Sequence, residues 1–368
     1  MINLRRILAF CLAAALVIGL AACGEDNASS SSSSAAAPPA QSLEQPEGPP
    51  PEVNLVTGEA LADGLAAGTR PVAIMINNIR ACLPQRGLGS ADAIFEMETE
   101  GGITRMMALF ADPAAIPAVG PVRSARDQHL QFALPLNAVF VHIGSSIYAQ
   151  NLLNQFGYQD VDGMYLGTTS FVFDEARNQA GYANEHCWYT DAAMIAAGMT
   201  ANNVASTGAA TPLFHFAQSA RTPDEGSAPD ISFKFSSLAP VKLTYDGASN
   251  SYLKQAYEQP QVDELTGAQL AFQNVLLLFC DVSLKPDGNC TDFDLREGTG
   301  YYCYGGKYQA VTWKKGTAAQ PLKLYDADGK ELEVNTGKSY IALVSNAYKD
   351  TLLLDPNAPQ AAGSSSGE

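Results

Sequence analysis

Apolar and polar residues follow different periodicities in the two halves of this chain. In the first half, short apolar runs bounded by turn residues alternate with segments of helical periodicity. Apolar runs of this length are typical of buried strands, and their alternation with helices is typical of an α/β domain. We therefore predict an α/β domain over residues 54–221. Its expected elements are strands at 72–76, 93–98, 104–110 and 138–143, and helices at 125–134 and 192–199.

In the second half the periodicity is shorter, because apolar and polar residues alternate one by one. Turn pairs such as Asp246-Gly247 and Gly305-Gly306 separate the alternating segments. This pattern is typical of hairpins. A polar linker at 222–229 separates the halves, and we predict a smaller, mostly-β domain over 230–355. Its expected strands are 231–235, 241–245, 252–257, 275–279, 300–304, 308–313, 323–325 and 340–344.

The N-terminus has the pattern of an export signal. Arg5 and Arg6 precede an uncharged run over 7–20, which is too short to span a membrane, and Leu20-Ala21-Ala22-Cys23 follows. We predict a lipoprotein signal peptide over 1–22 and lipid modification of Cys23, such as a palmitate-bearing diacylglycerol. The alternative is an ordinary secretory leader with a chance cysteine. Residues 23–53, rich in Ser and Pro, are predicted to be a disordered tether, and 356–368 a disordered tail.

Charge limits the partners of this chain. The formal charge is −16 at pH 7, and removing a leader whose charged residues are two arginines leaves −18. Broad binding to nucleic acid is therefore excluded, and any anion must enter a local arginine pocket. The Cys23 lipid would hold the protein to the bilayer at the outer face of the cytoplasmic membrane. The sequence suggests no cofactor.

Cysteine usage fits export. Beyond the leader and Cys23, the chain has five cysteines, which outside the cytoplasm tend to pair. We predict one disulfide among Cys280, Cys290 and Cys303, and a second between Cys82 and Cys187. The spacings do not suggest zinc.

Several motifs resemble the YerB-type lipoprotein family of Gram-positive bacteria. In the first half they include GGITR, which ends at Arg105, and GPVRSAR, which contains Arg123 and Arg126. In the second half they include residues 298–301, 305–308 and 312–315. The resemblance covers nearly all of the predicted folded region and implies two domains and a surface lipoprotein, while the family's function is unknown. Ile79 departs from the family pattern, where a histidine often stands, and so do Cys187 and Trp188, which replace Asn and Leu.

The arginines are the main candidate for chemistry. Arg105 follows a Gly pair at a strand edge, and Arg123 and Arg126 lie where a loop is expected to enter a helix. Arginines near a helix N-terminus suit phosphate, pyrophosphate or carboxylate. We expect the three to converge on one cleft. The alternative is an internal ion-pair network with acids such as Glu96 and Glu100.

Other residues complete the predicted ligand-binding set. His142 ends an apolar strand and His186 lies beside Tyr189, and we expect both histidines at the rim of the cleft. Asn77 and Asn78 end the first strand. A core role for a histidine on an apolar strand is the alternative. Glu96 and Glu98 share one side of a strand, but this spacing alone is a weak metal signal, and we predict no metal site.

Three functions follow from these residues. The first is a non-enzymatic lipoprotein that binds an anionic envelope ligand or a protein partner. The second is an enzyme acting on phosphorylated or lipid-linked glycans, because the arginine-rich run has a loose similarity to the LytR-CpsA-Psr transferases. The third is a structural scaffold for another envelope protein. No catalytic residue is identified.

Overall fold

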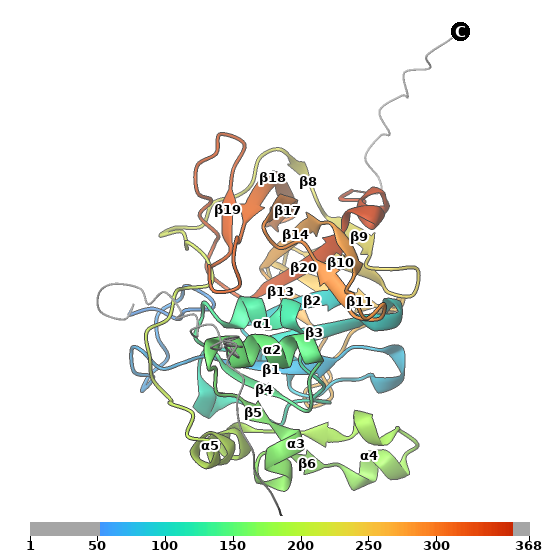
Figure 1. Ribbon diagram of the computed structural model, residues 1–368. Coiled ribbons are helices and arrows are strands. Elements are labelled where there is room, and N and C mark those ends of the chain that lie inside the picture. Colours follow the sequence, from blue (N-terminus) through green and yellow to red (C-terminus); the bar gives the residue numbers. More distant parts are fainter. Residues whose placement is uncertain (1–51, 356–368) are drawn as a thin grey trace, which may run out of the picture. The chain divides into compact units, whose positions relative to one another are not determined.

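The computed structural model describes residues 52–355, and the predicted signal peptide, Cys23, most of the tether and the tail lie outside them. The described chain is built around one large mixed sheet (Figure 1). In spatial order its strands are β19 (Lys323–Tyr325), β18 (Lys307–Lys314), β17 (Glu297–Tyr304), β14 (Asn274–Cys280), β20 (Ser339–Ser345), β2 (Ala93–Glu98), β3 (Thr104–Phe110), β1 (Val72–Asn77), β4 (Val139–His142) and β5 (Val161–Asp162), with β8 (Gly226–Ser227) beside β18.

The large sheet contains strands from both halves of the sequence. The C-terminal strand β20 lies between β14 and β2 and runs parallel to both. Its Ala342 is opposite Glu96 of β2. Strands from before and after the predicted linker therefore pair directly within one sheet. The pairing also fixes directions: β1, β2, β4, β5, β14 and β20 run one way, so their carboxyl ends lie at the same edge. We call this edge the carboxyl edge.

Both faces of the large sheet are covered, so the central strands β1, β2 and β3 are mostly apolar and are buried at nearly every position. In β1, Val72, Ile74 and Ile76 pack into one core, while Ala73 and Met75 pack into the other. The second core also contains side chains of helices α1 (Asp127–Ala133) and α2 (Ile147–Phe156), which lie in front of the sheet in Figure 1.

A second sheet packs against the first core, with Phe233, Leu243 and Tyr252 among its buried side chains. Its strands, in order, are β12 (Gln259–Pro260), β11 (Ser251–Ala256), β10 (Pro240–Asp246) and β9 (Asp230–Lys234), with β13 (Ala271–Phe272) also beside β11. The fold therefore has three layers, with α1 and α2 on one face of the large sheet and the small sheet on the other.

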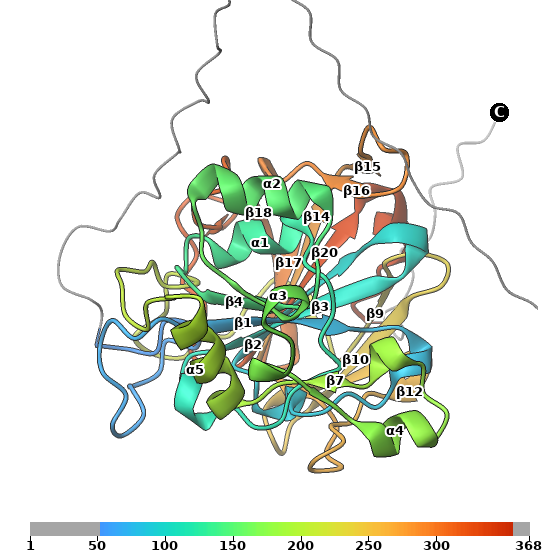
Figure 2. The ribbon, with the colours of Figure 1, turned by 60° about the horizontal axis from the view of Figure 1, so that its bottom comes forward.

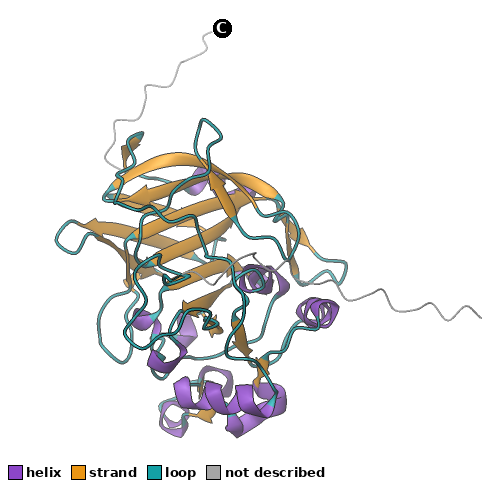
Figure 3. Ribbon diagram, turned by 90° about the vertical axis from the view of Figure 1, so that its left-hand side faces the viewer, coloured by secondary structure: helices purple, strands orange, loops and turns teal. Residues whose placement is uncertain are grey.

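Shorter elements gather at one end of the molecule (Figures 2 and 3). They are helices α3 (Gly163–Leu166), α4 (Glu175–Gln179) and α5 (Ala192–Ala201) and the strand pair β6 (Val172–Phe173) and β7 (Trp188–Tyr189). A further hairpin, β15 (Val282–Leu284) with β16 (Thr291–Phe293), lies beside α1, because Gln128 of α1 donates a hydrogen bond to Thr291. Within residues 52–355, no helix combines the length and hydropathy needed to cross a membrane.

Candidate functional site

The three predicted arginines lie together near the carboxyl edge. Arg105 is in β3, opposite Asn77 of β1. Arg126 is the N-cap residue of α1, and Arg123 precedes it in an extended segment whose backbone N–H donates to Met75. The helix begins only at Asp127, so the predicted helix over 125–134 starts two residues later than expected and both arginines lie in the segment before it. With seven residues, and with Asp127 in its first turn paired to Lys285, α1 offers no anion site at its own N-terminus.

Arg105 is almost entirely buried, with 4 % of its surface exposed. One terminal nitrogen donates to the Ser124 carbonyl at 2.9 Å, whereas the buried Nε has no hydrogen-bond partner within residues 52–355. Burial is the main reason that the pKa of Arg105 falls from 12.5 to about 9, and the charges of Arg126 and Arg123 lower it further. The charge of Glu100 acts in the opposite direction. Arg105 is therefore close enough to Arg126 and Arg123 to be affected by both charges.

Arg126 is the arginine that the fold neutralises. Its Nε and a terminal nitrogen both donate to the Glu100 carboxylate, the latter at 2.9 Å. Bidentate contacts of this kind are the strongest that an arginine makes with a carboxylate. Burial raises the pKa of Glu100, but the hydrogen bond and charge of Arg126 outweigh it, so the pKa lies below its ordinary value of 4.5. The predicted internal network therefore accounts for Arg126.

Arg123 has no such partner. It forms no ion pair with any residue of the described chain, and its Nε is buried without a hydrogen bond. The side chain as a whole is half-buried. Among the described residues, Arg105 and Arg123 thus form no ion pair, although the overall charge of the chain is strongly negative.

His186 lies next to this pair. It is part of a short 3-10 turn, and its Nδ1 accepts a hydrogen bond from the Asn77 side-chain amide at 2.9 Å. Burial, and then the charges of Arg123 and Arg177, lower its pKa, against the effect of Glu185. An accepting Nδ1 and a lowered pKa both favour a neutral ring with its proton on Nε2. No hydrogen bond from Nε2 to the described residues is formed, so this nitrogen remains a free donor.

His142 was wrongly placed at the rim of the cleft. Its side chain is fully buried at the end of β4, and both ring nitrogens are engaged within the fold. Nδ1 lies 2.8 Å from the Gly144 carbonyl and Nε2 lies 2.8 Å from an Asp160 carboxylate oxygen. The ring therefore fixes the loop after β4, which is the core role named above as the alternative.

Glu96 and Asn78 also belong to the interior, against the prediction. Glu96 is 1 % exposed and accepts hydrogen bonds from Asn78, Thr104 and Tyr340, while it pairs with Lys254. These partners use both carboxylate oxygens, so Glu96 is unavailable to the arginines. Within residues 52–355 no group of acids, histidines and cysteines is arranged to hold a metal ion.

Known proteins share both halves of this chain. The N-terminal domain of the family described as "Protein of unknown function (DUF3048)" matches residues 56–205, and the C-terminal domain of the same family matches residues 231–341. The chain belongs to the DUF3048 family.

The relatives of this DUF3048 protein include YerB of Bacillus subtilis, which is named as a candidate lipoprotein. YerB is 26% identical over 279 residues, or 75% of this chain and 81% of YerB. The crystal structure of B. subtilis YerB matches with a TM-score of 0.69 and 25% identity, covering 79% of this chain and 96% of the crystallised one. These matches confirm the resemblance and the predicted fold class, an α/β N-terminal part followed by a mostly-β part.

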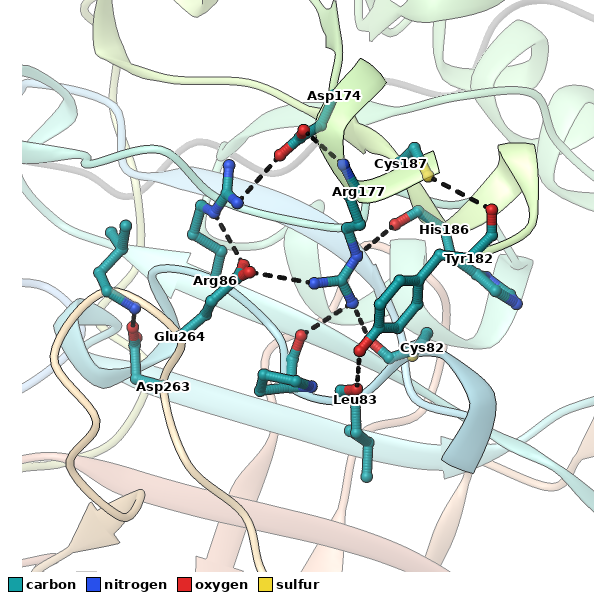
Figure 4. Close-up of polar contacts among 12 residues, drawn as sticks. Cys82, Leu83, Arg86, Asp174, Arg177, Tyr182, His186, Cys187, Asp263 and Glu264 are labelled. Atoms are coloured by element: carbon teal, nitrogen blue, oxygen red, sulfur yellow. Dashed lines mark hydrogen bonds and ion pairs between the residues drawn. The ribbon is translucent and has the colours of Figure 1, made fainter. Parts of the chain in front are cut away.

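A second polar cluster in this DUF3048 protein was missed by the sequence analysis (Figure 4). Arg177 of α4 is 5 % exposed and donates to the carbonyls of Cys82, Pro84 and His186. Glu264, from the second half of the chain, accepts from both Arg177 and Arg86, and Asp174 accepts from Arg86. All these charges are paired, so the cluster is a connection between the two halves. No local sequence pattern marks Arg86 or Arg177, because their partners are distant in sequence.

Tyr189, a predicted ligand residue, belongs to this second cluster. The guanidinium of Arg86 lies over its ring, 4.2 Å from the centroid. Its ring also fills the space beside Gly120, where an added Cβ would lie 2.6 Å from a ring carbon. The small size of Gly120 therefore serves packing against Tyr189.

Neither predicted disulfide is present in the DUF3048 fold. Cys82, Cys187, Cys280, Cys290 and Cys303 are free thiols and all are buried. Cys303 lies opposite Val275 in the β14–β17 pair, five residues along β14 from Cys280. That separation is about 17 Å at 3.4 Å per residue, well beyond the span of a disulfide. Proximity in sequence was therefore a poor guide within an extended hairpin.

Proposed function

We propose that this protein is a membrane-anchored, extracytoplasmic lipoprotein of YerB type that binds a phosphate- or carboxylate-bearing envelope ligand between Arg105 and Arg123. The observation that carries the proposal is the buried, unpartnered Nε of each of these arginines. Burying a polar group without a partner costs about 1–3 kcal/mol, and more for a charged group. An anion that accepts from both groups would offset this cost.

The surrounding residues support an anion over a neutral ligand. Glu100, the acid beside these arginines, is already occupied by Arg126. The free Nε2 of His186 adds a neutral donor on a residue that senses the charge of Arg123. Phosphate, with several acceptor oxygens, could accept from Arg105, Arg123 and His186 together. The position at the carboxyl edge agrees with where open α/β sheets commonly bind ligands.

The anchor rests on separate observations, the Leu20–Cys23 signal and the lipoprotein name of the relative YerB. With a tether of about 30 residues, the root-mean-square reach from the membrane would be roughly 30 Å, at 5–6 Å times the square root of the residue number. The folded part would thus stay close to envelope lipids and polymers.

The anion site is tested by measuring thermal unfolding of the chain from residue 24 onward, which contains every residue that the structure describes, with and without inorganic phosphate or pyrophosphate. At a ligand concentration of 100 times Kd, we expect about 2.7 kcal/mol of stabilisation. Arg123→Gln should abolish this response while leaving the stability without ligand within about 0.5 kcal/mol, because Arg123 has no protein partner to lose.

Arg296→Gln is the matched control, because Arg296 is exposed and pairs only with the nearby Asp294. It should keep the full phosphate response. Strong destabilisation by Arg123→Gln in the absence of ligand would instead show that Arg123 has a structural role, and an unchanged phosphate response would remove it from the site.

A further inference from the structure

The loop after β4 places exposed apolar side chains beside the unpaired arginines. Ala125, next to the arginine segment, forms a bridge with Ser145, and the backbone N–H of Ile143 donates to the carbonyl of Arg123. Ile147 begins α2 directly after this loop and is 62 % exposed. Residues 123–126 and 143–147 thus form one surface.

Helix α3 extends this surface. A Cβ added at Gly144 would lie 3.4 Å from Met164 Cγ and 3.5 Å from Ser124 Oγ, so Met164 and Ser124 both lie close to this glycine. The Ser124 carbonyl is the acceptor of Arg105. Met164 and the following Tyr165 are 69 % and 84 % exposed. Ile147, Met164 and Tyr165 are three of the most exposed large apolar residues of the described chain, and we call them the apolar rim.

Isolated exposed apolar residues need no explanation, but a cluster beside a binding site does. Two acids close to the rim in sequence, Asp160 and Asp162, are held by hydrogen bonds within the fold. Asp162 accepts from the backbone N–H groups of Gly144 and Met164, and Asp160 contacts His142. The rim therefore presents hydrocarbon and aromatic surface next to positive charge.

We infer that the natural ligand is a phosphate-bearing lipid, with its phosphate between Arg105 and Arg123 and its hydrocarbon chain along Ile147, Met164 and Tyr165. This inference rests on the anion site proposed above and specifies the rest of the ligand. An amphiphile fits both features at once, whereas a free phosphate uses only the arginines. Charge complementarity sets its orientation, because the phosphate accepts from the guanidinium groups and the chain covers the rim.

The test compares dihexanoyl phosphatidate, below its critical micelle concentration, with glycerol 3-phosphate, which has the same phosphate group and no acyl chains. Isothermal titration with the chain from residue 24 onward should give at least about tenfold tighter binding of the lipid, equivalent to about 1.4 kcal/mol. The double variant Met164→Ser with Tyr165→Ser should lose this preference while keeping its affinity for glycerol 3-phosphate. Both residues are exposed, so the fold should be retained.

Two controls separate the possible failures. Leu353→Ser, at an exposed leucine that pairs with Ser232 of β9, should keep the lipid preference. Arg123→Gln should lose both ligands. Equal affinity for the two ligands in the unmodified protein would overturn the lipid inference and leave the anion site in place. Absence of binding by either ligand would overturn the anion site, and with it the inference that rests on it.

Discussion

Glu96 of β2 and Lys254 of β11 form an ion pair of 3.1 Å in which neither side chain is appreciably exposed. The pair joins the two sheets through the core and links the two DUF3048 domains. Around it, Tyr340 donates to Glu96 and Gln261 accepts from Lys254. Every charged atom of the pair thus has a partner, as the interior of a protein requires.

Removing one member of this pair should be strongly destabilising. We expect Lys254→Met to lower the free energy of unfolding by about 3–5 kcal/mol, because it leaves the Glu96 carboxylate buried without its counter-charge. The double variant Lys254→Met with Glu96→Gln should be more stable than Lys254→Met alone. Urea unfolding of the three proteins measures both differences. Equal stability of the single and double variants would show that the two residues are not coupled.

The Arg126–Glu100 pair predicts a specific dependence of stability on pH. The pKa of Glu100 is lower in the folded protein than its ordinary value of 4.5. Its contribution is therefore complete above pH 4.5 and is lost as the pH falls through the folded pKa. The stability difference between the unmodified protein and Glu100→Gln should be constant from pH 7 to 5 and shrink below 4.5. A difference that grows on acidification would contradict the assignment.

The cysteines should behave as buried thiols. The pKa values of Cys82, Cys280 and Cys290 are raised to about 12, mainly because these thiols are buried. Little reactive thiolate is therefore present at pH 8. For the chain from residue 24 onward, we expect slow reaction with a thiol reagent in the folded state and five reactive thiols in guanidinium chloride. Fewer than five without a reductant would reveal a disulfide that the structure does not contain.

Lipidation at Cys23 can be tested in cells. Cys23→Ala should move the protein out of the lipid-anchored membrane fraction and remove the mass of the lipid from its N-terminus. The folded part should be unaffected, because Cys23 lies outside the described residues. An unchanged N-terminal mass would show that the protein is exported by an ordinary signal or retained in another way.

The sequence predicted best those strands whose pattern is contained within a few neighbouring residues. The expected strands at 93–98 and 104–110 match β2 and β3, because each is a short apolar run ended by turn residues. The short elements α3, α4 and β6 were missed, since two to five residues carry no measurable periodicity. For the candidate site, the sequence grouped Arg105, Arg123 and Arg126, but it could not show that Glu100 pairs with Arg126 and leaves Arg105 and Arg123 without an ion pair.

Contacts between the two halves of the chain could not be predicted from the sequence. Glu96 reads as a surface acid on an alternating strand, and Lys254 as a polar residue of a hairpin, so nothing local indicates that they meet. The same holds for Arg177 with Glu264 and for the insertion of β20 beside β2. Such pairings depend on the complete topology rather than on the residues that flank them.

The position of β20 has a consequence for export. If the chain crosses the membrane from its N-terminus, β2 and β14 reach the outside well before residues 339–345, the strand that separates them. Until then β2 has an unsatisfied edge, which is a template for incorrect strand pairing and aggregation. The sheet therefore closes only when nearly the whole chain has emerged, so a chain truncated before Ser339 would lack the strand that joins its two halves.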